Sequence, residues 1–325
     1  MQTKNLNYIV MNKKSYLVIN IILFAFFINN SVSARRADTE KCLRDFYVQT
    51  FCSVDNYCAP VQIDSKQIQD AIVDREEKSD STKSVFYNAF SHNDYWRSRP
   101  LTEALSYRFN CVEADLWLID GELYVAHGRS EIKKENTFES MYLKPLAELI
   151  KKNGGKVYTE SSKPFFLMVD CKTNGEAMYP VLKKIMEPYK DLFCSIDNGE
   201  YKEGAILFFL SGDRPLETLP EETSRFVFLD GRVKDLEKGI SAHLMPVISN
   251  SYTEYFKWKG EGEIPENELR KMREIISQTH KEGKLLRWWG APETKDFTLY
   301  LIKEGVDLIG SDNLEQLYNI LVEYR

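Results

Sequence analysis

The feature of this sequence that most constrains its fold is a set of eight short apolar segments that alternate with helical patterns from residue 85 onward. Most of the intervening stretches, such as residues 100–109 and 176–193, carry apolar residues at helical spacing. Eight parallel strands that alternate with helices close into a barrel. We therefore predict an α/β fold, a (β/α)8 barrel of the TIM type. The eight expected strands are VFYNAF (85–90), CVEADLWL (111–118), FFLMVDCK (165–172), AILFFLS (205–211), RFVFLD (225–230), LMPVIS (244–249), KLLRWWG (284–290) and VDLIGSD (306–312).

An open, doubly wound sheet is the alternative arrangement for alternating strands and helices. Such a sheet normally places a glycine-rich, phosphate-binding turn after its first strand. The residues that follow the first expected strand here are SHNDYW (91–96), which contain no glycine. The barrel is therefore the better prediction.

Charged and polar residues lie where a barrel places its chemistry, at the carboxyl ends of the strands. His92 follows the first expected strand, and Asp170 and Lys172 lie in the third. Glu113 and Asp115 lie in the second strand. Because side chains alternate along a strand, each of these two pairs shares one face. Buried charges are rare unless they are paired or ligated, so these positions call for a chemical explanation.

Two explanations for the shared acidic face are open. Each carboxylate pairs with a lysine or arginine, or the carboxylates together hold a metal ion. Three carboxylates from neighbouring strands supply hard oxygen ligands, which suit Mg²⁺ or Ca²⁺ better than zinc or copper. We expect one divalent cation, Mg²⁺ in preference to Ca²⁺, held by Glu113, Asp115 and Asp170. Lys172 then remains as a positive group for an anionic substrate.

The same alternation of side chains predicts the environment of two cysteines. Cys111 shares a face with Glu113 and is expected inside the lower barrel. Cys171 falls on the opposite face from Asp170 and is expected to point towards the helical layer. The two cysteines should therefore not form a disulfide.

A second histidine lies between the two acidic strands. The segment IDGELYVAHGRS (119–130) contains the turn signal Asp120-Gly121 and a short strand that ends at His127. Two histidines around a divalent cation and a lysine form a plausible phosphodiester-cleaving site. One histidine would act as base or nucleophile, and the other would protonate the leaving oxygen.

Four stretches of the chain carry distinctive motifs. They are SHNDYWRSRPLTEAL (91–105), VEADLWLIDGELYVAHG (112–128), FFLMVDCKTNGEA (165–177) and EGVDLIGSDNLEQL (304–317). These motifs resemble those of the altered inheritance of mitochondria protein family. That family belongs to the superfamily of phospholipase-C-like, TIM-barrel phosphodiesterases, which also includes glycerophosphodiester phosphodiesterases and spider sphingomyelinase D. The resemblance covers roughly residues 85–325.

The resemblance implies a role for each residue of the constellation. It implies that His92 and His127 are catalytic and that Lys172 contacts phosphate. It implies metal binding by the three carboxylates named above. Asn93 stands where glycerophosphodiester phosphodiesterases typically have arginine, and Asp170 stands where their third ligand is commonly glutamate. The Asp-x-Lys-Thr motif (170–173) and the His-Gly motif (127–128) resemble the sphingomyelinase D branch more closely. We expect Asn93 to contact substrate.

Other residues at the ends of expected strands have weaker assignments. Arg287 and Trp289 share a face of the seventh strand, where they either line the substrate mouth or cover the barrel exterior. Asp312 is expected to cap the last helix, which begins near Asn313. Asp94 either orients a neighbour by hydrogen bonding or caps the following loop. The remaining histidines, His243 and His280, are expected in surface or capping roles.

These observations favour a metal-dependent phosphodiesterase that acts on a phospholipid-type or related phosphodiester. A non-catalytic barrel that binds phosphorylated ligands is the alternative, but the chain retains both histidines, all three acids and the lysine. A glycosidase is disfavoured because Glu113 and Asp115 are too close on one strand to flank a glycosidic bond.

The amino-terminal segment has the three-part pattern of a secretory signal. Lys13 and Lys14 precede an apolar core from about Tyr16 to Phe27, and small residues end at Ala34. The core is shorter than the ~20 residues that span a bilayer, so an uncleaved anchor is the weaker alternative. We expect residues 1–34 to be a signal peptide, residues 35–84 a polar extension and residues 85–325 the barrel, in an exported protein.

Charge and cysteine content add limits on partners. Removing residues 1–34 deletes three lysines and no acids, so the net charge changes from −6 to −9. An acidic protein has no electrostatic footprint for nucleic acid. A lipid substrate is compatible with peripheral membrane contact, and no protein partner is predicted. Cys42, Cys52 and Cys58 fit no zinc pattern, so a local disulfide is the better expectation in an exported protein.

Overall fold

The computed structural model describes residues 84–325. The expected signal peptide, nearly all of the polar extension and the three cysteines at 42, 52 and 58 lie outside the described residues. Within residues 84–325, no helix is both long and apolar enough to cross a membrane.

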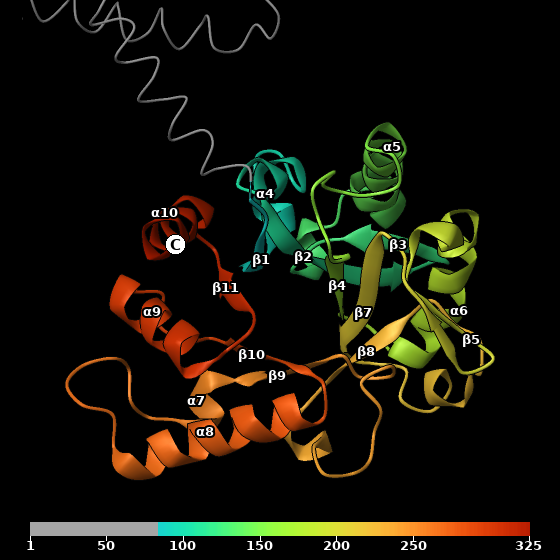
Figure 1. Ribbon diagram of the computed structural model, residues 1–325. Coiled ribbons are helices and arrows are strands. Elements are labelled where there is room, and N and C mark those ends of the chain that lie inside the picture. Colours follow the sequence, from blue (N-terminus) through green and yellow to red (C-terminus); the bar gives the residue numbers. More distant parts are fainter. Residues whose placement is uncertain (1–83) are drawn as a thin grey trace, which may run out of the picture. The chain divides into compact units, whose positions relative to one another are not determined.

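Eight parallel strands form the central sheet, and all eight expected segments contribute one strand each. They follow the order β10-β9-β8-β7-β4-β2-β1-β11, and β1 pairs with both β2 and β11. The bounds are β1 Phe86–Ser91, β2 Phe109–Ile119, β4 Phe165–Cys171, β7 Ile206–Gly212, β8 Phe228–Gly231, β9 Val247–Ser251, β10 Leu285–Trp289 and β11 Ile309–Ser311. The expected barrel is therefore confirmed, and its strands form a ring in Figure 1.

The ring has one weak seam, between β10 and β11. A single isolated parallel bridge, Arg287 with Leu308, joins these strands. The backbone N–H groups of Asp307 and Leu308 both donate to the Leu286 carbonyl oxygen at this bridge. Every other neighbouring pair forms a named ladder, so the barrel is nearly but not fully closed.

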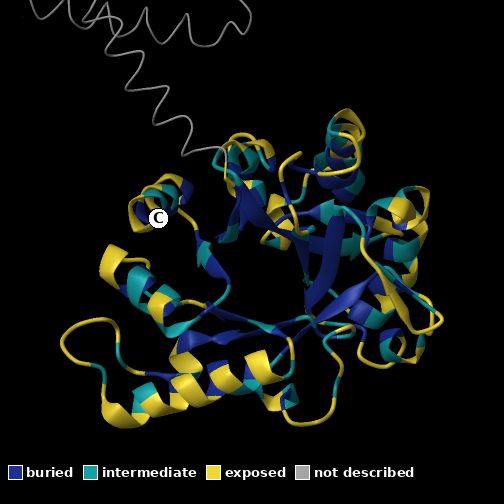
Figure 2. Ribbon diagram, in the orientation of Figure 1, coloured by how far each residue is buried: buried dark blue, intermediate teal, exposed yellow. Residues whose placement is uncertain are grey.

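Helices cover the outside of the ring (Figures 1 and 2). Their buried faces point to the strands and their outer faces are exposed, as expected for amphipathic helices. Sequence signals set both ends of helix α9: the Thr294 side chain accepts a hydrogen bond from the Phe297 N–H at its start, and Gly305 (φ 101°) ends it. The helices are α4 Thr102–Ser106, α5 Lys144–Lys152, α6 Gly175–Met186, α7 Tyr252–Tyr255, α8 Glu266–Lys281, α9 Lys295–Glu304 and α10 Leu314–Tyr324, with short 3-10 or π turns η1 Asp94–Trp96, η2 Arg129–Glu131, η3 Glu139–Leu143, η4 Glu187–Leu192, η5 Leu219–Glu221 and η6 Val233–Asp235.

Two short antiparallel additions complete the fold. Strand β3 (Glu122–Val125) pairs with the second half of β2, which confirms the expected short strand before His127. Strands β5 (Ser195–Asp197) and β6 (Glu200–Lys202) form a hairpin that we did not predict. Asn198 and Gly199 form its turn with positive φ angles of 51° and 86°, as an Asn-Gly hairpin turn requires.

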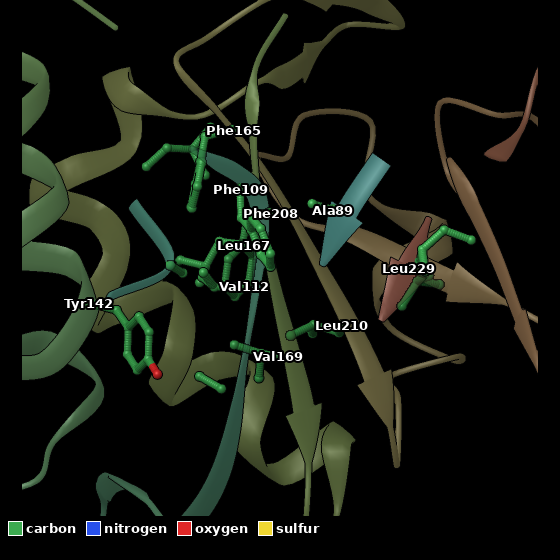
Figure 3. Close-up of a cluster of buried hydrophobic side chains, with 14 of the residues drawn as sticks. Ala89, Phe109, Val112, Tyr142, Phe165, Leu167, Val169, Phe208, Leu210 and Leu229 are labelled. Atoms are coloured by element: carbon green, nitrogen blue, oxygen red, sulfur yellow. The ribbon is translucent and has the colours of Figure 1, made fainter. Parts of the chain in front are cut away.

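The apolar core has two layers, separated by the wall of strands. The outer layer fills the space between strands and helices, and Figure 3 shows part of it around Phe109, Phe165 and Phe208. The inner layer occupies the lower barrel and consists of Phe90, Cys111, Met168, Cys194, Ile196, Leu207, Phe209, Phe228, Val247 and Leu308. Cys111 therefore lies inside and Cys171 in the outer layer, both as free thiols, which confirms the prediction for this pair.

Candidate active site

The predicted acidic residues meet at the carboxyl-terminal mouth of the barrel. Glu113 stands two residues above Cys111 on the inward face of β2, and Asp115 stands two residues above Glu113. The strand register pairs Asp115 with Asp170, and Asp170 in turn with Ser211. The inward face of the barrel therefore changes from apolar at the bottom to polar at the mouth.

Glu113 is the deepest of the three carboxylates. Its Oε2 lies 3.6 Å from His92 Nε2 and 3.7 Å from the Arg287 guanidinium, and the backbone N–H of Asn93 approaches it at 3.4 Å. Burial raises the pKa of this carboxyl group, and the positive charge of Arg287 partly opposes the rise. A cation at this position would favour the ionised form.

Asp115 is almost fully buried and uses its two oxygens unequally. Its Oδ2 accepts from Tyr95 Oη (2.6 Å), from Lys172 Nζ (2.8 Å) and from His127 Nδ1 (3.0 Å). Its Oδ1 is buried without a hydrogen-bond partner among the described residues. A buried, unpaired carboxylate oxygen is costly, so this atom is open to a further ligand.

Lys172 lies just beyond the end of β4 and links two of the acids. Its Nζ lies 2.6 Å from Asp170 Oδ2 and 2.8 Å from Asp115 Oδ2. Burial alone would lower the pKa of this amine, but the two carboxylates outweigh it and the pKa is raised. Lys172 therefore stays positively charged at neutral pH.

His92 contacts residues of the loop after β1 and a residue that directly follows β11. Its Nδ1 lies 2.9 Å from Asp312 Oδ1. Arg97 donates to the backbone carbonyl oxygens of both His92 and Asp312. The Asn93 side-chain amide also donates to Asp312 Oδ1, at 3.1 Å. The Asn93 amide nitrogen also lies 3.1 Å from His92 Nδ1. Because a carboxylate only accepts hydrogen bonds, a neutral His92 that donates to Asp312 carries its proton on Nδ1, and its Nε2 faces Glu113 at 3.6 Å.

His127 is held in a similar way but is more exposed. Its Nδ1 faces Asp115, and its ring packs against Trp96 with a centroid separation of 5.0 Å. The hydroxyl of Tyr95 lies 3.1 Å from the same nitrogen and 2.7 Å from Asn93 Oδ1. Both predicted catalytic histidines therefore have Nδ1 next to a carboxylate, and Nε2 of His92 faces a second carboxylate, Glu113.

Arg287 and Trp289 both lie at the carboxyl-terminal end of the barrel, near His92 and Glu113. Arg287 is buried, lies over the Phe90 ring at 4.0 Å and approaches Glu113. Trp289 is 44% exposed and lines a pocket together with His92. Trp288, between them, points to the outer apolar layer.

One sequence-based assignment is wrong. Asp312 does not cap α10, because Asn313 occupies the cap position and its side chain accepts from Gln316 N. The Asp312 side chain instead turns inward to His92. Alternation along β11 indicated this orientation, since Leu308 lies in the inner layer and two further steps of two lead to Asp312. Tyr95 was also missed, and no local pattern distinguishes it from a loop tyrosine.

The remaining polar predictions concern residues away from the reacting groups. Asp94 is buried and accepts from Ser91 Oγ, from Leu101 N and from Tyr142 Oη, so it anchors the loop after β1. His243 and His280 are exposed on the surface, as expected. His280 pairs with Asp307 at 2.8 Å near the end of α8.

Residues 79–230 match the family model described as the AIM6-like phosphodiesterase domain. The chain is therefore similar to that family over these residues. The match contains both histidines, all three mouth carboxylates and Lys172, whereas Arg287, Trp289 and Asp312 lie beyond it.

Curated relatives of the AIM6-like domain extend the similarity over more of the chain. The altered inheritance of mitochondria protein 6 homolog of Arthroderma benhamiae is 28% identical over 291 residues, which are 78% of this chain and 92% of that protein. Altered inheritance of mitochondria protein 6 of Saccharomyces cerevisiae is 29% identical over 271 residues, 69% of this chain and 68% of that protein. Altered inheritance of mitochondria protein 6 of Lachancea thermotolerans is 25% identical over 283 residues, which are 73% of this chain and 66% of that protein.

Two solved structures resemble this chain more distantly. A glycerophosphodiester phosphodiesterase from Parabacteroides distasonis has a TM-score of 0.43 and 12% identity, covering 74% of this chain and all of that one. One from Agrobacterium tumefaciens has a TM-score of 0.40 and 14% identity, covering 72% of this chain and all of that one.

The donor set of the mouth fits a hard divalent cation in its chemistry. It consists of three carboxylates and includes the unpartnered Asp115 Oδ1. Among residues 84–325, however, no three His, Cys, Asp or Glu side chains are already arranged as a metal cage. Lys172 neutralises Asp115 and Asp170 in this arrangement, so binding a cation would require Lys172 to move.

Proposed function

We propose that this protein is a metal-dependent phosphodiesterase that cleaves a phospholipid-type or related phosphodiester by histidine acid/base catalysis. The observation that carries the proposal is the pair of imidazoles at one barrel mouth. Each has Nδ1 anchored on a carboxylate, Asp312 for His92 and Asp115 for His127. An imidazole that is anchored through Nδ1 can transfer a proton through Nε2.

In the proposed reaction the two histidines act on opposite sides of the phosphorus atom. One takes a proton from the attacking oxygen as the new P–O bond forms. The other gives a proton to the leaving oxygen as the old P–O bond breaks. The geometry is similar for both histidines, so it does not assign the two roles. Water or a hydroxyl group of the substrate itself can be the attacking group.

Positive charge at the mouth binds the phosphate and stabilises its charge in the transition state. Lys172 and Arg287 supply two cationic groups, and Asn93 supplies an amide for a polar contact. A divalent cation held by Glu113, Asp115 and Asp170, Mg²⁺ in preference to Ca²⁺, would supply Lewis-acid stabilisation of the phosphate oxygens. Lys172, which pairs with Asp115 and Asp170, would then be available to contact the substrate phosphate.

Exposed tryptophans beside the histidines support a lipid substrate. Trp96 is 53% exposed and packs on His127, while Trp289 is 44% exposed and lies near His92. Indole rings are favoured where one side is apolar and the other is wet, as at a membrane surface. We propose that the mouth makes peripheral contact with lipid through these two side chains, in an exported protein.

The direct test is product analysis on a panel of lysophospholipids and glycerophosphodiesters. Phosphorus NMR with and without EDTA would identify the bond cleaved and its dependence on a cation. A suitable control is His280→Ala, because His280 also pairs with a carboxylate but lies outside the mouth. Tight binding of a panel member with no turnover by the native protein would instead support a phospho-ligand-binding barrel.

A further inference from the structure

A crevice beside the mouth of the barrel has His92 among its lining residues. Its volume is about 130 Å³. At its outer end it is lined by polar or exposed residues, including His92 and Trp289. At its inner end it is lined by Leu301 of α9 together with Leu317 and Ile320 of α10, all at most 5% exposed. The lining thus combines the candidate catalytic group with buried apolar side chains.

The weak seam of the barrel accounts for the position of this crevice. The crevice is lined by residues of both β10 and β11, the two strands that share a single bridge. In Figure 1, α9 and α10 lie next to each other outside these strands. Ile320 is buried but does not belong to the outer apolar cluster that includes Leu317 and Leu321.

The lining indicates the chemistry of a ligand. The buried apolar side chains of the crevice cannot donate hydrogen bonds to a phosphate, but they would make van der Waals contacts with an alkyl chain. A ligand that fits this lining therefore carries an apolar chain.

We propose that this crevice is the subsite for the apolar chain of the substrate, so that the preferred substrate is a single-chain lipid phosphodiester such as a lysophospholipid. The proposal rests on the proposed function, because it requires the phosphate to lie at His92. Engineered cavities of ~150 Å³ admit benzene, so the crevice accommodates about six carbon atoms. The remainder of a longer chain would extend past Trp289 along the exposed rim.

Binding as a function of chain length tests the subsite separately from catalysis. The probes are alkyl phosphocholines of increasing length, kept below their micelle concentrations and titrated into the full-length His127→Ala protein by calorimetry. The Kd should fall by about fourfold per added methylene, equivalent to ~0.8 kcal/mol, and level off near six carbons. A Kd that does not depend on chain length would overturn the proposal.

A pair of neighbouring variants supplies the control. Ile320→Phe places a larger side chain in the crevice, whereas Leu321→Phe enlarges an equally buried side chain that does not line it. Chain-length dependence should be lost in the first variant and retained in the second, with thermal melts confirming that both fold. If Ile320→Phe does not fold, Leu301→Phe replaces it. Equal chain-length dependence in a folded crevice variant and in Leu321→Phe would also overturn the subsite.

These readouts separate the subsite from the proposed function. If the native protein cleaves chain-free diesters but the probes bind without chain-length dependence, the phosphodiesterase stands and the subsite fails. If chain-length dependence is present and lost in Ile320→Phe while no diester is cleaved, the crevice binds lipid chains and the proposed function fails.

Discussion

Replacing Asp312 with asparagine should slow catalysis without weakening substrate binding. The asparagine keeps the size of the side chain and an oxygen that can still accept from Asn93, but it removes the negative charge facing His92 Nδ1 at 2.9 Å. A charge-assisted hydrogen bond contributes about 1.5–3 kcal/mol. Because the Asp312 side chain is 50% exposed, the lower value applies, which corresponds to a loss of about tenfold in kcat.

The assay is steady-state kinetics on a confirmed substrate, with kcat and KM determined separately. A positioning role predicts that kcat and kcat/KM fall together, because the contact gains strength as His92 gains charge in the transition state. Asp307→Asn is the matched control, since Asp307 pairs with His280 at 2.8 Å outside the mouth. An unchanged kcat in Asp312→Asn, or an equal loss in Asp307→Asn, would refute the assignment.

Three further predictions concern the cation, the acid stability and the amino terminus. Asp115→Asn should weaken Mg²⁺ binding measured by calorimetry, and an unchanged Mg²⁺ affinity would reject Asp115 as a ligand. Lys172→Gln should lower the Tm in EDTA and enlarge the rise of Tm on adding Mg²⁺, because Asp115 and Asp170 are then no longer neutralised by Lys172. Burial would raise the pKa of Glu282, but hydrogen bonds, the strongest from the buried Lys284, lower this pKa to about 2. The ionised Glu282 therefore stabilises the fold fully above its ordinary pKa of 4.5, and this stabilisation is lost as the pH falls towards 2. Glu282→Gln should cost about 3 kcal/mol of unfolding free energy at neutral pH and flatten the acid limb of a urea-denaturation series, and an unaltered acid limb would contradict this. Amino-terminal sequencing of exported protein should begin close to Arg35, and a start at Met1 or Met11 would contradict cleavage.

The strands could be predicted from sequence because parallel strands buried on both faces appear as continuous apolar runs. Their ends were less predictable. The sixth expected strand began at residue 244, but β9 begins at Val247, since Pro246 lacks an N–H for a ladder and the residues before it form a turn on Ser241. The β5–β6 hairpin was missed although its Asn-Gly turn was visible, because its strands have only three residues each.

Some features of the candidate site follow from the local sequence, whereas others depend on contacts between distant parts of the chain. Glu113 and Asp115 could be placed on one inward face because alternation is a local property of a strand. The contact between His92 and Asp312 joins positions 220 residues apart and exists only because the barrel closes β1 against β11. The partners of Tyr95 likewise depend on how the loop after β1 folds over the mouth.

The most direct test of the central claim is the kinetics of His92→Ala, His127→Ala and the double variant on one confirmed substrate. If both imidazoles transfer protons in one catalytic unit, each single variant should lose ~10²-fold or more in kcat with KM nearly unchanged. The double variant should then be scarcely slower than the more damaged single variant. A nitrophenyl phosphodiester, with its very good leaving group, should partly restore only the variant that lacks the general acid. Full activity of the double variant on the confirmed substrate would contradict the proposed mechanism.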